Sequence, residues 1–186
     1  LEEIGKVPAA AEKMRDGLSV KLSALHPRYS AAQESDCVPA LTEKLRVLAV
    51  LAARSNTPLT VDAEEVDRLA LSLAIIGNTM EDPALSGWEG FGLAVQAYQK
   101  RCPAVVEWCA EQAQARGRRM QVRLVKGAYW DAEIKRAQVM GLPDYPVFTR
   151  KENTDLSYIA GAARLLAHRD RLYPMLATHN AHTVCA

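Results

Sequence analysis

The sequence predicts an α/β fold, a (β/α)8 barrel of the TIM type with about six βα units present. Short apolar strand candidates recur along the chain, and each is followed by an amphipathic stretch, which is typical of a parallel sheet with covered faces. No glycine fingerprint follows the first strand, as a doubly wound nucleotide fold would usually show. A polar residue ends every predicted strand, which favours a barrel because its strand ends converge on one mouth.

Six segments are predicted as strands, in the order in which they occur along the chain. They are residues 18–22, 59–62, 92–96, 122–125, 146–149 and 175–179. The polar residues at their ends are Lys21, Asp62, Gln96, Arg123 with Lys126, Thr149 with Lys151, and Thr178 with His179. In a barrel, these side chains would form a ring around the mouth.

Helices are predicted between these strands. Residues 38–53 and 63–77 carry apolar side chains at helical spacing, and 103–117 starts with proline and stops at glycine. Another helix follows from Asp131, with acids before bases, and residues 2–15 are also helix-like. Six units fall short of eight, and a typical barrel takes about 250 residues. We therefore expect residues 1–186 to be one barrel domain that lacks the first strand and the last βα unit.

Composition indicates an ordinary globular domain. The chain has 186 residues, 49% of them hydrophobic, and a net charge of +1, so nothing suggests a nucleic-acid partner. No signal or transit peptide and no membrane span is evident, which makes the cytoplasm the default location. The four cysteines lack CxxC spacing, so we expect buried reduced thiols rather than a zinc or disulfide framework; they are Cys37, Cys102, Cys109 and Cys185.

The most informative segment is residues 121–130, where Arg123 and Lys126 lie in an apolar run that ends in glycine and aromatics. Lysine and arginine are rarely buried unless they are paired, so an anionic partner is expected. Three interpretations are open: a Schiff-base Lys126 as in aldolase-type barrels, an anion clamp beside Gly127, or ion pairs with Asp62 and Asp131.

Two other strand ends leave alternatives open. Asp62 either caps the following helix in a capping box with Glu65 or faces the mouth. Lys21 should point into the barrel, where a substrate carboxylate or Asp62 would be its partner. The pair His179 and His182 is too weak a pattern for a metal site, so none is predicted and a hydrogen-bonding role for His179 is favoured.

Five runs resemble a known family, the proline dehydrogenase domain of the bifunctional bacterial flavoenzymes of the proline utilization A type. The runs are residues 20–29, 61–65, 96–101, 123–130 and 177–183, and the resemblance covers essentially the whole chain. It implies a distorted (β/α)8 barrel with FAD at the strand C-termini. It also implies oxidation of L-proline to Δ1-pyrroline-5-carboxylate by hydride transfer to flavin N5, the first step of proline catabolism to glutamate.

The resemblance implies specific residue roles. Lys21 would pair with the proline carboxylate, Asp62 would order the substrate-binding side chains, and Arg123 would lie beside flavin N5. Ala128 and Tyr129 would contact substrate, and Gln96 would bond the flavin's pyrimidine edge. The other residues implied along the cofactor are Ala63, Val125, Lys126, Gly127, Ala128, Trp130, Thr149, Arg150, Lys151, Thr178, His179 and Asn180.

The resemblance further implies that the arginine pair which clamps the proline carboxylate follows Ala186. It implies membrane quinone as electron acceptor, with peripheral association of the parent enzyme at the inner membrane face. Two alternatives to proline oxidation remain: a Schiff-base aldolase-type barrel that uses Lys126, and a catalytically inert barrel fragment.

Overall fold

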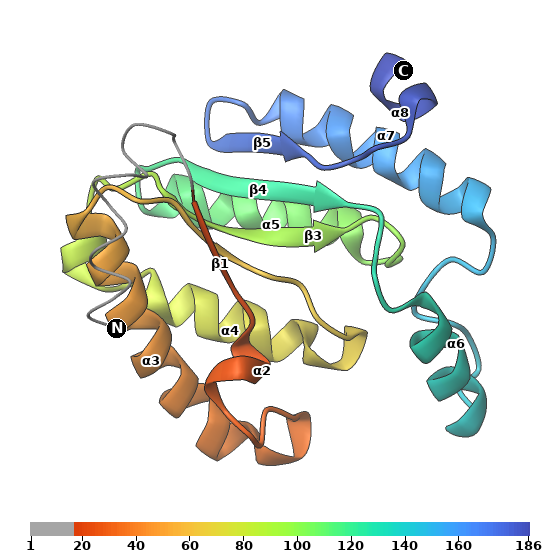
Figure 1. Cartoon of the computed structure of the whole chain (residues 1–186), viewed down its shortest axis with the longest axis horizontal. Coiled ribbons are helices and arrows are strands. Elements are labelled where there is room, and N and C mark those ends of the chain that lie inside the picture. The colour runs from red at the N-terminus through yellow and green to blue at the C-terminus, as the bar shows by residue number, and fades with distance from the viewer. Residues whose placement is uncertain (1–16) are drawn as a thin grey trace.

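A five-stranded parallel sheet forms the centre of the structure, a computed structural model that describes residues 17–186 (Figure 1). The strands follow one another across the sheet in chain order; they are β1 (Leu18–Val20), β2 (Leu59–Val61), β3 (Phe91–Gln96), β4 (Met120–Val125) and β5 (Leu172–Leu176). In a doubly wound sheet the order would reverse at a switch point. Sequential order with right-handed crossovers places the connecting helices on one face, so this sheet is part of a barrel wall.

Helices lie between the strands and after the last one. They are α2 (Leu22–Leu25), α3 (Glu34–Arg54), α4 (Leu69–Thr79), α5 (Cys102–Ala115), α6 (Trp130–Val139), α7 (Lys151–Ala167) and α8 (Ala181–Cys185). Short 3-10 turns are η2 (Ala31–Gln33), η3 (Val66–Arg68) and η4 (Pro83–Leu85). Helix α5 packs on β3 and β4, α7 packs on β4 and β5, and α6 lies beyond the C-terminal end of β4 (Figure 1).

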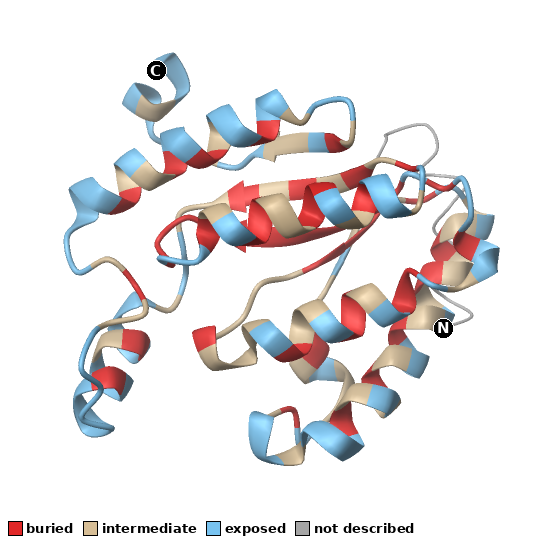
Figure 2. Ribbon diagram, turned by 180° about the vertical axis from the view of Figure 1, so that it is seen from behind, coloured by how far each residue is buried: buried red, intermediate tan, exposed pale blue. Residues whose placement is uncertain are grey.

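The core lies between the sheet and the helices (Figure 2). Strand β4 shows how the sequence separates the two faces, because Met120, Val122 and Leu124 are fully buried while the alternate residues are only half-buried. Side chains alternate between the faces of a strand. The alternate residues, which include Arg123, therefore point toward the barrel interior, and this inner face is where functional side chains can gather.

One predicted strand is wrong. Residues 146–149 form only an isolated antiparallel bridge between Gln99 and Val147, outside the sheet. Val147 is buried in a small separate cluster with Val66 and Tyr98, and Pro146 has no N–H to offer a neighbouring strand. The described residues therefore hold five strands in the sheet, one fewer than predicted.

Other boundaries differ by a few residues. The last predicted strand, 175–179, is β5 at Leu172–Leu176, and the helix predicted over 63–77 is α4 at Leu69–Thr79, preceded by η3. No side chain caps η3 at its N-terminus, so the capping box of Asp62 and Glu65 is wrong. The helix predicted over 2–15 lies outside the described residues.

The cysteines are free, and three of them are buried as predicted: Cys37, Cys102 and Cys109. Burial raises the pKa of Cys102 to about 11, which keeps its thiol protonated. Cys185 is exposed, contrary to the prediction. No helix among residues 17–186 combines the length and apolar character needed to cross a membrane.

Candidate active site

One row of side chains crosses the inner face of the sheet near the strand C-termini. Arg123 lies in register with Ala94 of β3 and Met175 of β5. Asp62 and Lys21 follow directly on β2 and β1, whose last residues Val61 and Val20 are paired. Because in-register residues of parallel neighbours point to the same face, this pairing brings Lys21, Asp62 and Arg123 together.

The carboxylate of Asp62 is shared by two cations. Its Oδ2 accepts a hydrogen bond from Lys21 Nζ at 2.8 Å, and its Oδ1 is bonded by Arg123 Nη2. Arg123 Nη1 also donates to Ser19 Oγ at 2.9 Å. The hydrogen bond that Lys21 donates to Asp62 raises the pKa of Lys21 above its usual 10.5. Asp62 therefore faces the mouth and is the anionic partner predicted for both cations.

Lys126 has a different partner from the two that the sequence suggested. Its Nζ bonds Asp155 Oδ1 on α7 and donates to Thr183 Oγ1 on α8 at 3.1 Å. Asp131, the other expected counter-ion, is exposed and forms no ion pair within residues 17–186. The predicted ion pair of Arg123 with Asp62 is confirmed, whereas Asp131 as a counter-ion is wrong and Asp155 pairs with Lys126 instead.

The side chain of Gln96, at the end of β3, forms hydrogen bonds with residues that follow β2 and β4. Its Nε2 donates to Glu64 O at 2.9 Å, and its Oε1 accepts from Ala128 N at 3.2 Å. The side chain is almost fully buried. One N–H of the amide remains for a ligand, since the group carries two donors.

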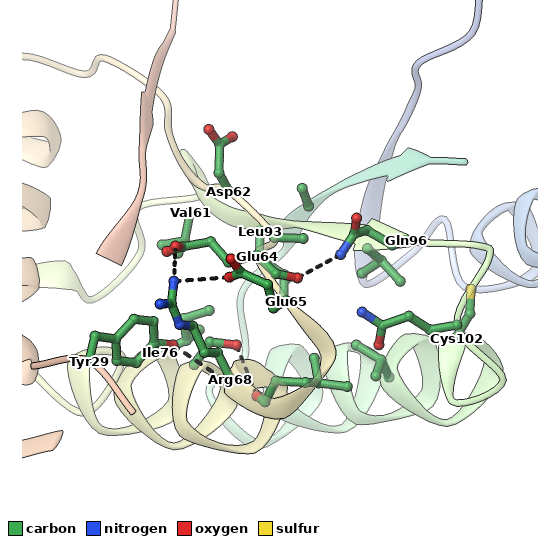
Figure 3. Close-up of a pocket in the computed structure, with 17 residues that line it drawn as sticks. Tyr29, Val61, Asp62, Glu64, Glu65, Arg68, Ile76, Leu93, Gln96 and Cys102 are labelled. Carbon is green, nitrogen blue, oxygen red and sulfur yellow. Dashed lines mark hydrogen bonds and ion pairs between the residues drawn. The ribbon is translucent and has the colours of Figure 1, made fainter. Parts of the chain in front are cut away.

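Behind the end of β2 lies a second layer of charges that the sequence did not single out as functional (Figure 3). Glu64, with only 5% of its side chain exposed, accepts from Ser23 N at 3.0 Å and from Arg68 Nη1 at 2.8 Å. Figure 3 shows the Asp62 carboxylate pointing away from Glu64 and Arg68. Glu64 therefore links the segment after β1, which carries Lys21, to the segment after β2, which carries Asp62. Its place two residues after the strand-end Asp62 was the available signal.

Glu64 and Arg68 border a small cavity of about 20 Å³ between the sheet and the helices. Such a volume holds about one water molecule. Cys102, Gln96 and Arg68 lie on its wall (Figure 3). Gln99 lines it as well. The cavity is too small for a substrate.

Two larger cavities open at the strand C-termini. One, of about 530 Å³, is lined by most of the residues that the sequence implicated, namely Lys21, Asp62, Ala63, Gln96, Arg123, Val125, Lys126, Gly127, Ala128, Tyr129, Lys151, Thr178, His179 and Asn180. The second, of about 420 Å³, is lined by Trp130 and Thr149 and shares Lys126, Gly127 and Lys151 with the first. Arg150 lines neither cavity. Both volumes lie in the range usual for small-molecule sites.

Helix α6 is fixed beside these cavities by charged contacts. Buried Glu133 accepts from Val66 N at 2.7 Å, and Arg136 pairs with Asp67 at 2.6 Å. Burial raises the pKa of Glu133. Trp130 Nε1 donates to Phe148 O at 2.8 Å. These contacts hold Tyr129 and Trp130 at the cavity walls.

Gly127 occupies a position that only glycine fits. Its φ is +146°, and an added Cβ would lie 2.5 Å from Cγ of Tyr98. We expect Gly127→Ala to lower the free energy of unfolding by about 2 kcal/mol, measured by urea denaturation. Gly141→Ala is the matched control, because its φ is +59° with nothing within 4 Å; it should cost about 1 kcal/mol. Equal losses in the two variants would show that Tyr98 yields and that the close approach is unimportant.

The side chains that line the two larger cavities suit an anionic ligand with a planar part. Arg123, Lys126 and Lys151 supply positive charge along the cavity walls, while Tyr129 and Trp130 supply aromatic surface. Within residues 17–186, no group of three or more His, Cys, Asp or Glu side chains is placed to hold a metal ion.

Comparison with known proteins points to one family. The sequence profile described as "Proline dehydrogenase" matches residues 1–186. The chain is 52% identical over 170 residues to the bifunctional protein PutA of Salmonella typhimurium, covering 91% of this chain and 13% of that protein. It is 30% identical over 184 residues to human hydroxyproline dehydrogenase, covering 94% of this chain and 38% of that protein.

A solved structure shows the same likeness in three dimensions. A crystal structure of Bradyrhizobium japonicum proline utilization A superposes with a TM-score of 0.89 at 57% identity, covering 90% of this chain and 17% of that one. The chain thus spans well under a fifth of the length of these bifunctional proteins.

Proposed function

Since the chain belongs to the proline dehydrogenase family, we propose that it oxidises L-proline to Δ1-pyrroline-5-carboxylate with FAD as cofactor. The observation that carries the proposal is the row of Lys21, Asp62 and Arg123 at the wall of the 530 Å³ cavity. In this row, a lysine suited to bind a carboxylate and an arginine belong to the same ion-pair network. A small zwitterionic substrate needs such a polarised site.

The residues present fit a flavin dinucleotide. Two adjoining cavities share the cations Lys126 and Lys151, which suit an anionic diphosphate. Gly127 lines both cavities, and its lack of a Cβ lets Tyr98 pack against its backbone there. We assign the cofactor contacts to residues that line the two cavities. Thr149, Thr178, His179 and Asn180 are among them. The bound flavin supplies the two-electron acceptor.

We assign the binding of the substrate carboxylate to Lys21. Its ammonium group has three donors, and Asp62 takes one of them. The remaining donors bind the proline carboxylate, while Ala128 and Tyr129 line the substrate side of the cavity. Asp62 keeps Lys21 and Arg123 at fixed separation, so that the substrate and the reacting edge of the cofactor meet in one geometry.

The aldolase-type alternative is not favoured. A Schiff-base lysine must attack as a neutral amine, whereas Lys126 is bonded to Asp155 and Thr183. The proposal extends to membrane quinone as electron acceptor and to peripheral membrane association, which the family resemblance implies, and to a cytoplasmic location.

The test is product formation by the purified protein. With FAD, L-proline and a soluble quinone, mass spectrometry should show a product two hydrogens lighter than proline. The stereoisomer D-proline is the control substrate, and trans-4-hydroxy-L-proline tests the activity named for the human relative. Turnover of hydroxyproline alone would overturn the substrate assignment. Borohydride trapping of a carbonyl substrate on Lys126, without proline oxidation, would replace the proposal with the aldolase alternative.

A further inference from the structure

Asp155 joins two lysines that lie on the walls of both large cavities. Its Oδ1 bonds Lys126 Nζ, and its Oδ2 accepts from Lys151 Nζ at 2.6 Å. Lys126 follows β4, and Lys151 is the first residue of α7. One carboxylate thus fixes ammonium groups from two separate elements of the fold.

The fixation of Lys126 is more extensive than that of an ordinary surface lysine. Thr183 of α8 accepts from its Nζ at 3.1 Å, and the ring of Tyr158 lies 5.9 Å from the same atom. Only 24% of the Lys126 side chain is exposed. Contacts from α7 and α8 therefore leave the ammonium group little freedom.

Helix stability does not explain the arrangement on α7. A cation at the first residue opposes the helix dipole, and lysine placed four residues before an acid is the less favourable order for an ion pair along a helix. Lys151 is nevertheless at this position and is 70% exposed. Both features suit a cation that faces a ligand rather than one that stabilises its helix.

The charges leave a surplus for an anion. Two ammonium groups share one carboxylate, and both line the cavities of about 530 and 420 Å³. Lys126 uses two donors within the protein and Lys151 uses one. Of their six N–H donors, three remain for a ligand.

We infer that Asp155 is a positioning residue that holds Lys126 and Lys151 in place for the anionic diphosphate of the dinucleotide cofactor. This role rests on the proposed function, because it deepens the assignment of the flavin site. Ordering two flexible lysines before binding removes an entropic cost that the ligand would otherwise meet.

The experiment compares FAD binding to the purified wild-type protein and to Asp155→Asn, by fluorescence titration in 0.15 M NaCl. We expect the Kd for FAD to rise about tenfold in Asp155→Asn, and Asp155→Glu to recover most of the affinity. The matched control is Asp144→Asn, because Asp144 pairs with Lys100 at 2.6 Å and neither residue lines the two cavities. Its Kd should equal that of the wild type.

A second readout needs no cofactor. In the flavin-free protein, acetic anhydride should acetylate Lys126 several-fold faster in Asp155→Asn than in the wild type, as followed by peptide mass spectrometry. An unchanged or lower Kd for FAD in Asp155→Asn, with normal wild-type binding, would overturn the positioning role alone. Wild-type protein that binds no FAD would overturn the proposed function, and the role of Asp155 with it.

Discussion

Replacing Asp62 with alanine is expected to lower kcat/KM for L-proline by about 100-fold, equivalent to roughly 2.7 kcal/mol. Asp62 is the shared partner of Lys21 and Arg123. Without it, two like charges lie side by side on the inner face and repel each other, so both the substrate-binding and the cofactor-facing cation move. Removing one partner of a fully buried pair also lowers the free energy of unfolding by about 3–5 kcal/mol, and the 19% exposure of Asp62 places this loss of stability somewhat below that range.

Steady-state kinetics with a stability control can separate this effect from loss of fold. Asp82→Ala is the matched variant, because Asp82 also pairs with an arginine, Arg46 at 3.0 Å, and lies outside both large cavities. We expect Asp82→Ala to lower stability while leaving kcat/KM within twofold. Asp62→Asn, which keeps the shape and loses the charge, should fall between the wild type and Asp62→Ala. A loss in Asp82→Ala as large as that in Asp62→Ala would refute a specific role for Asp62.

Replacing Lys21 with methionine should raise KM for L-proline about 20-fold with a smaller change in kcat. A hydrogen bond to a charged group contributes about 1.5–3 kcal/mol, and the half-exposed side chain of Lys21 favours the lower part of that range. Methionine keeps the length of the chain and removes only the ammonium group. Lys100→Met is the control, since Lys100 forms an exposed pair with Asp144. An unchanged KM in Lys21→Met would remove the carboxylate-binding role.

The same lysine predicts a pH dependence. Because the bond to Asp62 raises the pKa of Lys21 above 10.5, the ammonium form persists at all lower pH values and is lost only as the pH rises through the raised value. The contribution of Lys21 to substrate binding should therefore be constant between pH 7 and pH 9. The ratio of KM values for Lys21→Met and the wild type measures it directly, and a ratio that falls toward one over this interval would contradict the ion pair.

Much of the site could be predicted from the sequence, because parallel strands bring their C-terminal residues to one edge. Lys21, Asp62 and Arg123 are far apart in the chain, yet each lies in or directly after a recognisable apolar strand. The pairing of Lys21 with Asp62 was one of two partners named for this lysine, and the register of β1 and β2 brings the two side chains together. The polar side chains at the ends of strands can thus be identified from the local sequence pattern.

The misses have a common physical cause, which is that tertiary contacts override local pattern. Asp155 lies in an amphipathic helix, where an acidic residue is usually solvated, and only the packing of α7 beside β4 brings it to Lys126. Residues 146–149 have strand-like composition, but their backbone bonds the loop after β3: Phe148 N donates to Tyr98 O at 2.8 Å. Neither contact has a signature in the residues nearby.

Anaerobic titration of the flavin-loaded protein with L-proline tests the central claim most directly. The site described by Lys21, Asp62 and Arg123 predicts that the visible flavin absorbance bleaches on addition of L-proline and stays unchanged with D-proline. Bleaching should need a higher proline concentration in Lys21→Met. A protein that binds FAD and keeps its full absorbance at saturating L-proline would contradict proline oxidation at this site.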